Sequence, residues 1–158
     1  MIEVDRSGVN VVLVVLVLIL AFLHFLFGPL FDSWFAAPNL LVCGVLVAAR
    51  QLRPGAAAAL GFALGLLEDA MAVSHFGLAT LLLVLLGYLG SLTRDLFVGE
   101  EILFIGTYLF IGTWLFEVTS YLAIGGDSLF FVLLQAPVDA IATGVVGYMV
   151  VPIMAKAS

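Results

Sequence analysis

Long apolar runs separated by short polar turns make up most of this chain. Six runs predict helices across a bilayer, over residues 11–30, 37–49, 55–67, 76–92, 102–124 and 129–154. A helix needs about 20 residues to cross the hydrocarbon core. The second and third runs are shorter, which indicates local thinning of the bilayer or burial against neighbouring helices. The pattern therefore predicts an all-α polytopic membrane protein with one domain over residues 1–158.

The basic residues predict the orientation of these helices. All five can be placed on one side of the membrane, and every second connection carries no Lys or Arg: Arg6, Arg50, Arg53, Arg94 and Lys156. Loops rich in Lys and Arg stay in the cytoplasm. Six spans with both termini cytoplasmic satisfy that rule.

The composition agrees with a membrane protein and excludes several other classes. The chain has 158 residues, 65% hydrophobic and 10% charged, whereas soluble domains carry about 25% charged residues. A net charge of -6, without a basic stripe, argues against a nucleic-acid partner. A single Cys43, placed in an apolar run, excludes an internal disulfide, and no Cys/His cluster suggests a metal or cofactor. The first run exceeds a signal-peptide core and lacks a cleavage pattern, so we expect a retained helix.

Small residues distinguish the third span. The third contains the run GAAAALGFALG with a G-x-x-x-G pair, Gly61 and Gly65. Small residues let helices approach closely in lipid, so this span is predicted to be central rather than lipid-facing.

Pro38 and Pro54 are each expected in the first turn of a helix, where a backbone N–H has no partner within the helix and its absence in proline costs no hydrogen bond.

Several polar residues interrupt the apolar spans. Glu117 lies in span 5, and Gln135, Asp139 and Thr143 follow one face of span 6 because they are four residues apart. Asp139 is about 15 Å from the outer end of its helix, near the midplane. Such residues mark an interior face and are candidate functional sites. His24 lies in the outer half of span 1.

Two interpretations of these polar residues remain open. One is a proton or ion path, or a pocket for a small ligand. The other, which we favour, is interhelical hydrogen bonding with neutral acids, because no basic residue lies at this depth. Pro137 leaves the carbonyl of Leu133 without its helical donor, so Asp139 is also a candidate cap for that opening.

Glu68 and Asp69 follow span 3 at the predicted outer interface. They are interpreted as a solvated helix end, or as a structural turn or partner contact, and His75 is expected to pair with one of them. No set of residues has spacing that suggests a nucleophile and its base. We therefore do not expect an enzyme.

A series of short motifs runs through the first two thirds of the chain. They are Pro38-Asn39-Leu40-Leu41, the Arg50–Arg53 turn, Gly61-Phe62-x-x-Gly65-Leu66-x-x-Asp69, Gly77-Leu78, Gly87-Tyr88 and Arg94, with Pro152 and Lys156 later. Their order and spacing resemble the rod shape-determining protein MreD family. The chain differs from the family pattern in having Glu68 before Asp69, Thr143 where an Asn is expected, and Asp139.

The resemblance implies a non-enzymatic inner-membrane subunit of the bacterial cell-elongation complex, which organises peptidoglycan synthesis and cell shape. Implied partners are an MreC-like single-span scaffold protein and, through it, an MreB-like filament and a RodA-type synthase with its transpeptidase; a homodimer is also possible. Expected partner or helix-packing residues are Gly61, Phe62, Gly65, Asp69 and Gly77. The alternative is a substrate-binding S component of an energy-coupling-factor vitamin transporter, of similar size and span number, which would use the polar interior. That likeness is an analogy of fold.

Overall fold

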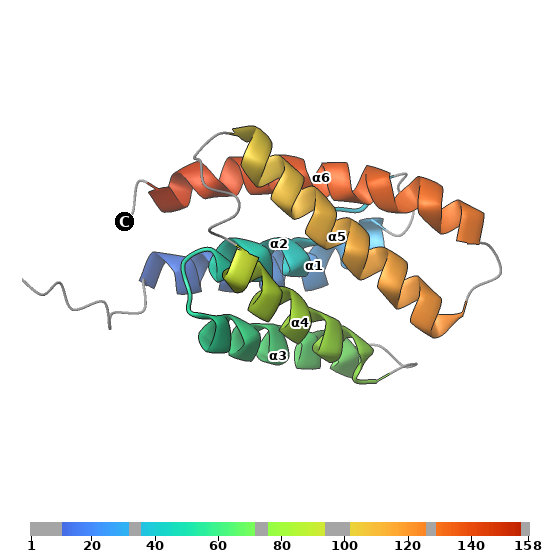
Figure 1. The fold of residues 1–158 in the computed structure, drawn as a ribbon, viewed down its shortest axis with the longest axis horizontal. Helices are drawn as coiled ribbons and strands as arrows, with labels where there is room; N and C mark the ends of the chain where they lie inside the picture. Colours follow the sequence, from blue (N-terminus) through green and yellow to red (C-terminus); the bar gives the residue numbers. More distant parts are fainter. Residues whose placement is uncertain (1–10, 32–35, 72–75, 94–101, 126–128, 156–158) are drawn as a thin grey trace, which may run out of the picture.

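The computed structural model describes residues 11–31, 36–71, 76–93, 102–125 and 129–155. These residues form six α-helices in a bundle (Figure 1): α1 (Val11–Phe31), α2 (Leu40–Ala49), α3 (Pro54–Met71), α4 (Leu78–Thr93), α5 (Ile102–Ile124) and α6 (Leu129–Ala155). Three contain segments long and apolar enough to cross a membrane: Val11–Gly28, Ile105–Ile124 and Val132–Pro152. The prediction of an all-α membrane protein is confirmed.

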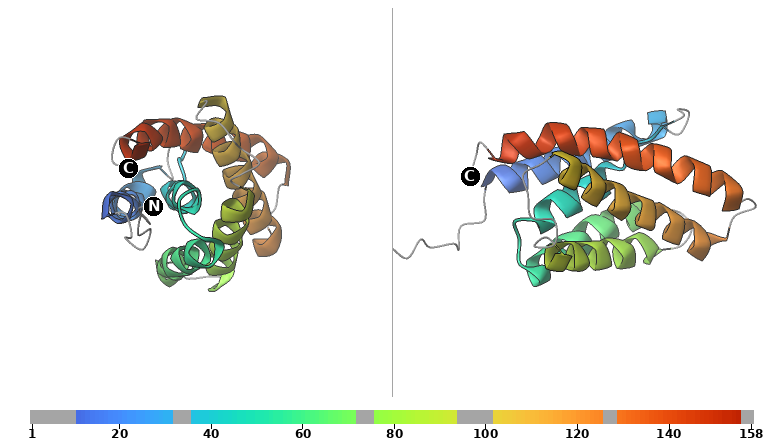
Figure 2. Two further views of the ribbon diagram at one scale, coloured as in Figure 1. Left: turned by 60° about the vertical axis from the view of Figure 1, so that its left-hand side comes forward. Right: turned by 45° about the horizontal axis from the view of Figure 1, so that its top comes forward.

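Helix α2 is the centre of the bundle. All ten of its residues are buried, and it packs against each of the other five helices. The view along the bundle shows α2 surrounded by its neighbours (Figure 2). Cys43, in the middle of this helix, is fully buried. The short second run is therefore explained by burial against other helices.

Two helix pairs, α3 with α4 and α5 with α6, pack closely around α2. In the first pair, an added Cβ on Gly61 would collide with the carbonyl oxygen of Leu83, and one on Gly65 with the Cα of Thr80. Gly87 of α4 faces the carbonyl of Ala57 in the same way. These glycines bring the two backbones together, as small residues do in membrane helices. The stripe packs inside the protein, and the opposite face of α3 is exposed.

Two predicted helix boundaries are wrong. Pro38 precedes α2, whose N-cap is Asn39, because polar groups of α6 hold the segment before the helix in an extended form. Helix α3 continues through Asp69 to Met71, because Asp69 has buried partners and does not end the helix in solvent.

Helix α1 packs mainly on α2 and exposes large apolar side chains along its outer face. It is also joined to α3 by a polar contact between His24 Nε2 and Glu68 Oε2, at 3.3 Å. Glu68 thus pairs with a histidine of another helix. His75, the predicted partner, lies outside the described residues.

Candidate functional site: two helix caps and a polar seam

Asp69 is a buried carboxylate that caps the first turn of α4. Its side chain is 2% exposed. Oδ1 accepts from the N–H of Ala79 at 3.0 Å, and Oδ2 accepts from the N–H of Thr80 at 2.8 Å and from the Thr80 hydroxyl. The first N–H groups of a helix have no partner within it and need an outside acceptor. The interpretation of Asp69 as a solvated helix end is therefore wrong, because the carboxylate is buried and bonded to another helix.

The residue that precedes α4 explains why the cap comes from another helix. A side chain at the N-cap position usually accepts from the second or third N–H of its own helix. That position is Gly77, which has a φ of +98° and no side chain. Glycine adopts this backbone conformation without strain, and Asp69 supplies the missing acceptor. The close packing at Gly61 and Gly65 places α3 within reach of the α4 N-terminus.

Asp139 performs a similar task for the segment that leads into α2. Its Oδ1 accepts from the N–H of Ala37 at 2.7 Å and from the amide of Gln135 at 3.3 Å. Asp139 is 6% exposed. The candidate role of capping the backbone at Pro137 is thus wrong, because the carboxylate is directed to a different segment of the chain.

Thr143, one turn further along α6, completes this second cap. Its hydroxyl oxygen accepts from the N–H of Asn39 at 2.9 Å, and the hydroxyl donates to the carbonyl of Asp139 at 2.8 Å. Asn39 in turn accepts from the N–H of Val42 at 3.1 Å. Unpaired backbone groups are costly inside a membrane. Asp139 and Thr143 of α6 therefore supply acceptors for the backbone N–H groups that precede α2.

A row of polar residues runs between α5 and α6, and we call this row the α5–α6 seam. It consists of Thr113, Glu117 and Tyr121 on α5, and of Gln135, Asp139 and Thr143 on α6. Two contacts set its register. The position of Gly147 faces Leu109, and the carboxyl group of Glu117 interacts with that of Asp139. The helices are antiparallel, so these contacts place Thr113 opposite Thr143 and Tyr121 opposite Gln135.

Thr113 is the seam residue that sequence reasoning missed. It is fully buried, and its hydroxyl has no hydrogen-bond partner among the described residues. Its position four residues before Glu117 was the available signal, because that spacing places both on one helical face.

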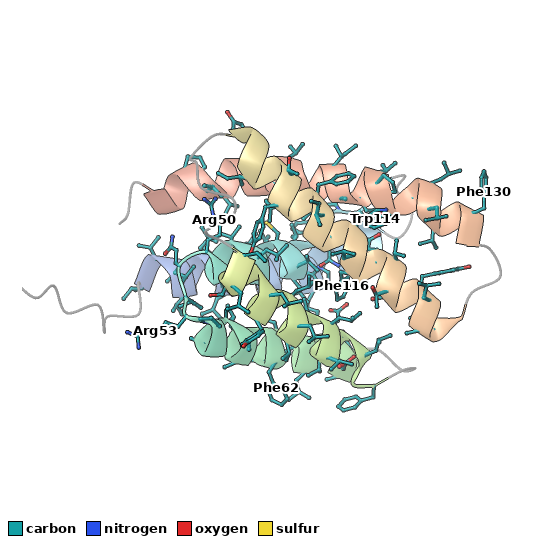
Figure 3. All side chains as sticks on the ribbon, viewed as in Figure 1. Arg50, Arg53, Phe62, Trp114, Phe116 and Phe130 are labelled. Atoms are coloured by element: carbon teal, nitrogen blue, oxygen red, sulfur yellow. The ribbon has the colours of Figure 1, made fainter. Side chains whose placement is uncertain are left out.

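The motif residue Phe62 lies on the outside of the bundle. Its side chain is 53% exposed and projects away from the α3–α4 contact (Figure 3). The structure thus separates the predicted partner or packing residues: Gly61, Gly65, Asp69 and Gly77 build the α3–α4 pair, whereas Phe62 does not. The predicted intramembrane polar residues also separate, because His24 pairs with α3 while Glu117, Gln135, Asp139 and Thr143 lie in the seam.

The family model for rod shape-determining protein MreD matches residues 5–156, nearly the whole chain. The chain belongs to the MreD family. None of the curated proteins and none of the solved structures matches it.

Membership makes this MreD protein a membrane protein that determines rod cell shape. The family is a structural component of shape determination rather than a family of enzymes. The motif Gly61-Phe62-x-x-Gly65-Leu66-x-x-Asp69 of this chain also gains a physical account, since its glycines and its acid join α3 to α4.

Proposed function

We propose that this MreD protein is a non-catalytic subunit of the cell-elongation complex that binds an MreC-like single-span scaffold protein. Through that partner it helps to organise the MreB-like filament and the RodA-type synthase with its transpeptidase, and hence peptidoglycan synthesis. The observation that carries the proposal is the family match over residues 5–156. Its place is the bacterial inner membrane, with six spans in one domain and both termini cytoplasmic.

The distribution of basic and buried polar groups supports this role. Arg50 and Arg53 lie at the same end of the bundle (Figure 3), as an inner-membrane orientation requires. The buried carboxylates Asp69 and Asp139 accept from backbone N–H groups of the α4 and α2 entries. A scaffold needs such rigid helix entries.

The outward face of α3 is the surface we propose for the partner helix. Phe62 belongs to the family motif but makes no contribution to the α3–α4 contact. Ala59 and Ala63 beside it are small and exposed, so a partner helix can approach the backbone closely there. A single-span protein can offer such a helix, and an aromatic side chain contributes a large contact area.

The test of the complex is purification of the tagged protein from native membranes, with mass spectrometry of the proteins and small molecules that accompany it. The expected result is an MreC-like protein together with cell-wall synthases. Recovery of an ATP-binding transporter module or a stoichiometric vitamin would contradict the proposal and support the S-component alternative. Recovery of a second copy alone would indicate a homodimer in place of the mixed complex.

The test of the surface compares two phenylalanines in the same purification. Phe62→Ala is expected to lower recovery of the MreC-like protein at least several-fold. Phe22 of α1 is also exposed, at 66%, so Phe22→Ala is the matched control and is expected to leave recovery unchanged. Equal recovery with both variants, at equal membrane levels, would remove the α3 face from the proposal.

A further inference from the structure

The α5–α6 seam contains two acids, Glu117 and Asp139, that have no basic partner among the residues that the structure describes. Of the five Lys and Arg residues in the sequence, the described part of the chain includes Arg50 and Arg53, which flank the turn between α2 and α3. The seam lies further along the bundle, beside the start of α2, because Asp139 binds the N–H of Ala37. Two carboxyl groups that share one site cannot both remain charged without a counter-charge.

The donors around Asp139 leave one side of the carboxylate for Glu117. The N–H of Ala37 and the amide of Gln135 both reach Oδ1. The Glu117 carboxyl also interacts with this acid. Oxygen atoms therefore face each other across the seam, an arrangement that suits a hard cation.

The hydroxyl of Thr113 is a second and independent sign of an occupant. It is fully buried and has no hydrogen-bond partner in the part of the chain that the structure describes. Buried polar groups are nearly always paired. Thr113 lies between Leu109 and Glu117, both of which contact α6, so its position on α5 faces the seam.

We propose that the α5–α6 seam binds one monovalent cation, a proton or Na⁺, between the carboxyl groups of Glu117 and Asp139 and beside the hydroxyl of Thr113. The cation neutralises one negative charge and leaves Oδ1 of Asp139 as the acceptor for Ala37. Its occupancy is thereby linked to the segment that leads into α2.

Few other titratable groups face this site. On α5 the next is Tyr121, opposite Gln135. On α2 it is Cys43, whose sulfur lies near the position of Gly147. His24 of α1 is paired with Glu68 of α3. The His24–Glu68 pair is the same in the seam variants and in the wild type, so comparing a variant with the wild type isolates the seam.

The test measures the thermal unfolding midpoint of the purified full chain, with NaCl exchanged for choline chloride at constant ionic strength, and at several pH values. We expect the wild-type midpoint to rise with Na⁺, or as the pH falls, by at least about 2–4 °C. A rise with Na⁺ identifies the cation as Na⁺, and a rise at lower pH without a rise with Na⁺ identifies it as a proton.

Glu117→Gln removes one charge at nearly constant shape and should abolish the response of the unfolding midpoint. Glu101→Gln, the same change in the segment between α4 and α5, should retain it.

Two further variants keep the test decisive. Asp139→Asn preserves an acceptor for Ala37, removes the other charge, and should also abolish the response. Thr113→Val removes the hydroxyl at constant shape and should weaken the response; an unchanged response would exclude Thr113 from the site. A wild type that responds to neither Na⁺ nor pH, or a Glu117→Gln variant that responds as the wild type does, would overturn the proposal.

Discussion

The α3–α4 and α5–α6 pairs show two ways to join helices in a membrane. In the first, glycines let backbones touch, and the one buried acid, Asp69, is paired on both oxygens. In the second, the carboxyl group of Glu117 interacts with that of Asp139, and the Thr113 hydroxyl has no hydrogen-bond partner among the described residues. The α3–α4 contact therefore has a fixed geometry. The α5–α6 contact can hold the cation that we propose between its polar side chains.

The largest effect is expected where the backbones touch. Gly65→Ala places a methyl group against the Cα of Thr80, which cannot move without displacing α4. Such overpacking costs about 1–3 kcal/mol or more. Thermal unfolding in detergent, followed by tryptophan fluorescence, measures the loss. Gly106→Ala on α5 is the control, because nothing lies within 4 Å of its added Cβ; equal losses in both would contradict the packing account.

The next effect concerns the α4 cap. Asp69→Ala leaves the N–H groups of Ala79 and Thr80 without their acceptor, a loss of about 1–3 kcal/mol. Asp69→Asn keeps one acceptor oxygen and should fall between the alanine variant and the wild type. The same unfolding measurement checks this order. If the two variants were equally stable, the cap would not be the source of the stability.

A comparable but smaller loss is expected in the α2 cap. Thr143→Val removes the single acceptor for the N–H of Asn39, a loss of about 1–3 kcal/mol. Thr93→Val is the matched control, because its exposed hydroxyl donates to the carbonyl of Leu89 in its own helix. Hydrogen exchange at Asn39 would rise in the first variant alone. Unchanged protection there would argue against the Thr143 contact.

The smallest effect is expected from Asp139→Asn. Both described donors to Asp139 reach one oxygen, which the amide of asparagine reproduces, so stability should change by less than about 1 kcal/mol. The contrast with Asp69→Asn tests the comparison directly, because Asp69 uses both oxygens. A larger loss from Asp139→Asn than from Asp69→Asn would reverse our account of the two acids.

Much of the fold could be predicted from the sequence. Apolar runs give the six helices, because hydrophobic length limits what can cross a bilayer. The Gly61–Gly65 stripe indicates close packing before its partner is known. The shortness of the second run already suggested the burial that α2 shows.

The partners of the polar residues could not be predicted in the same way. Asp139 binds Ala37, 102 residues away in the sequence, and Glu68 pairs with His24 of the first helix. Periodicity tells which face a residue occupies and leaves open which helix covers that face. Pro38 was misplaced for the same reason, since the extended segment before α2 exists only because α6 supplies acceptors.

The central claim is that this MreD protein binds a single-span partner through the outward face of α3. Its most direct test is a photo-crosslinking residue placed at position 62, and separately at position 22, in native membranes. Our account predicts a crosslinked single-span protein of the MreC type from position 62 and none from position 22. The same protein from position 22 alone, or from neither position while the complex still co-purifies, would contradict it.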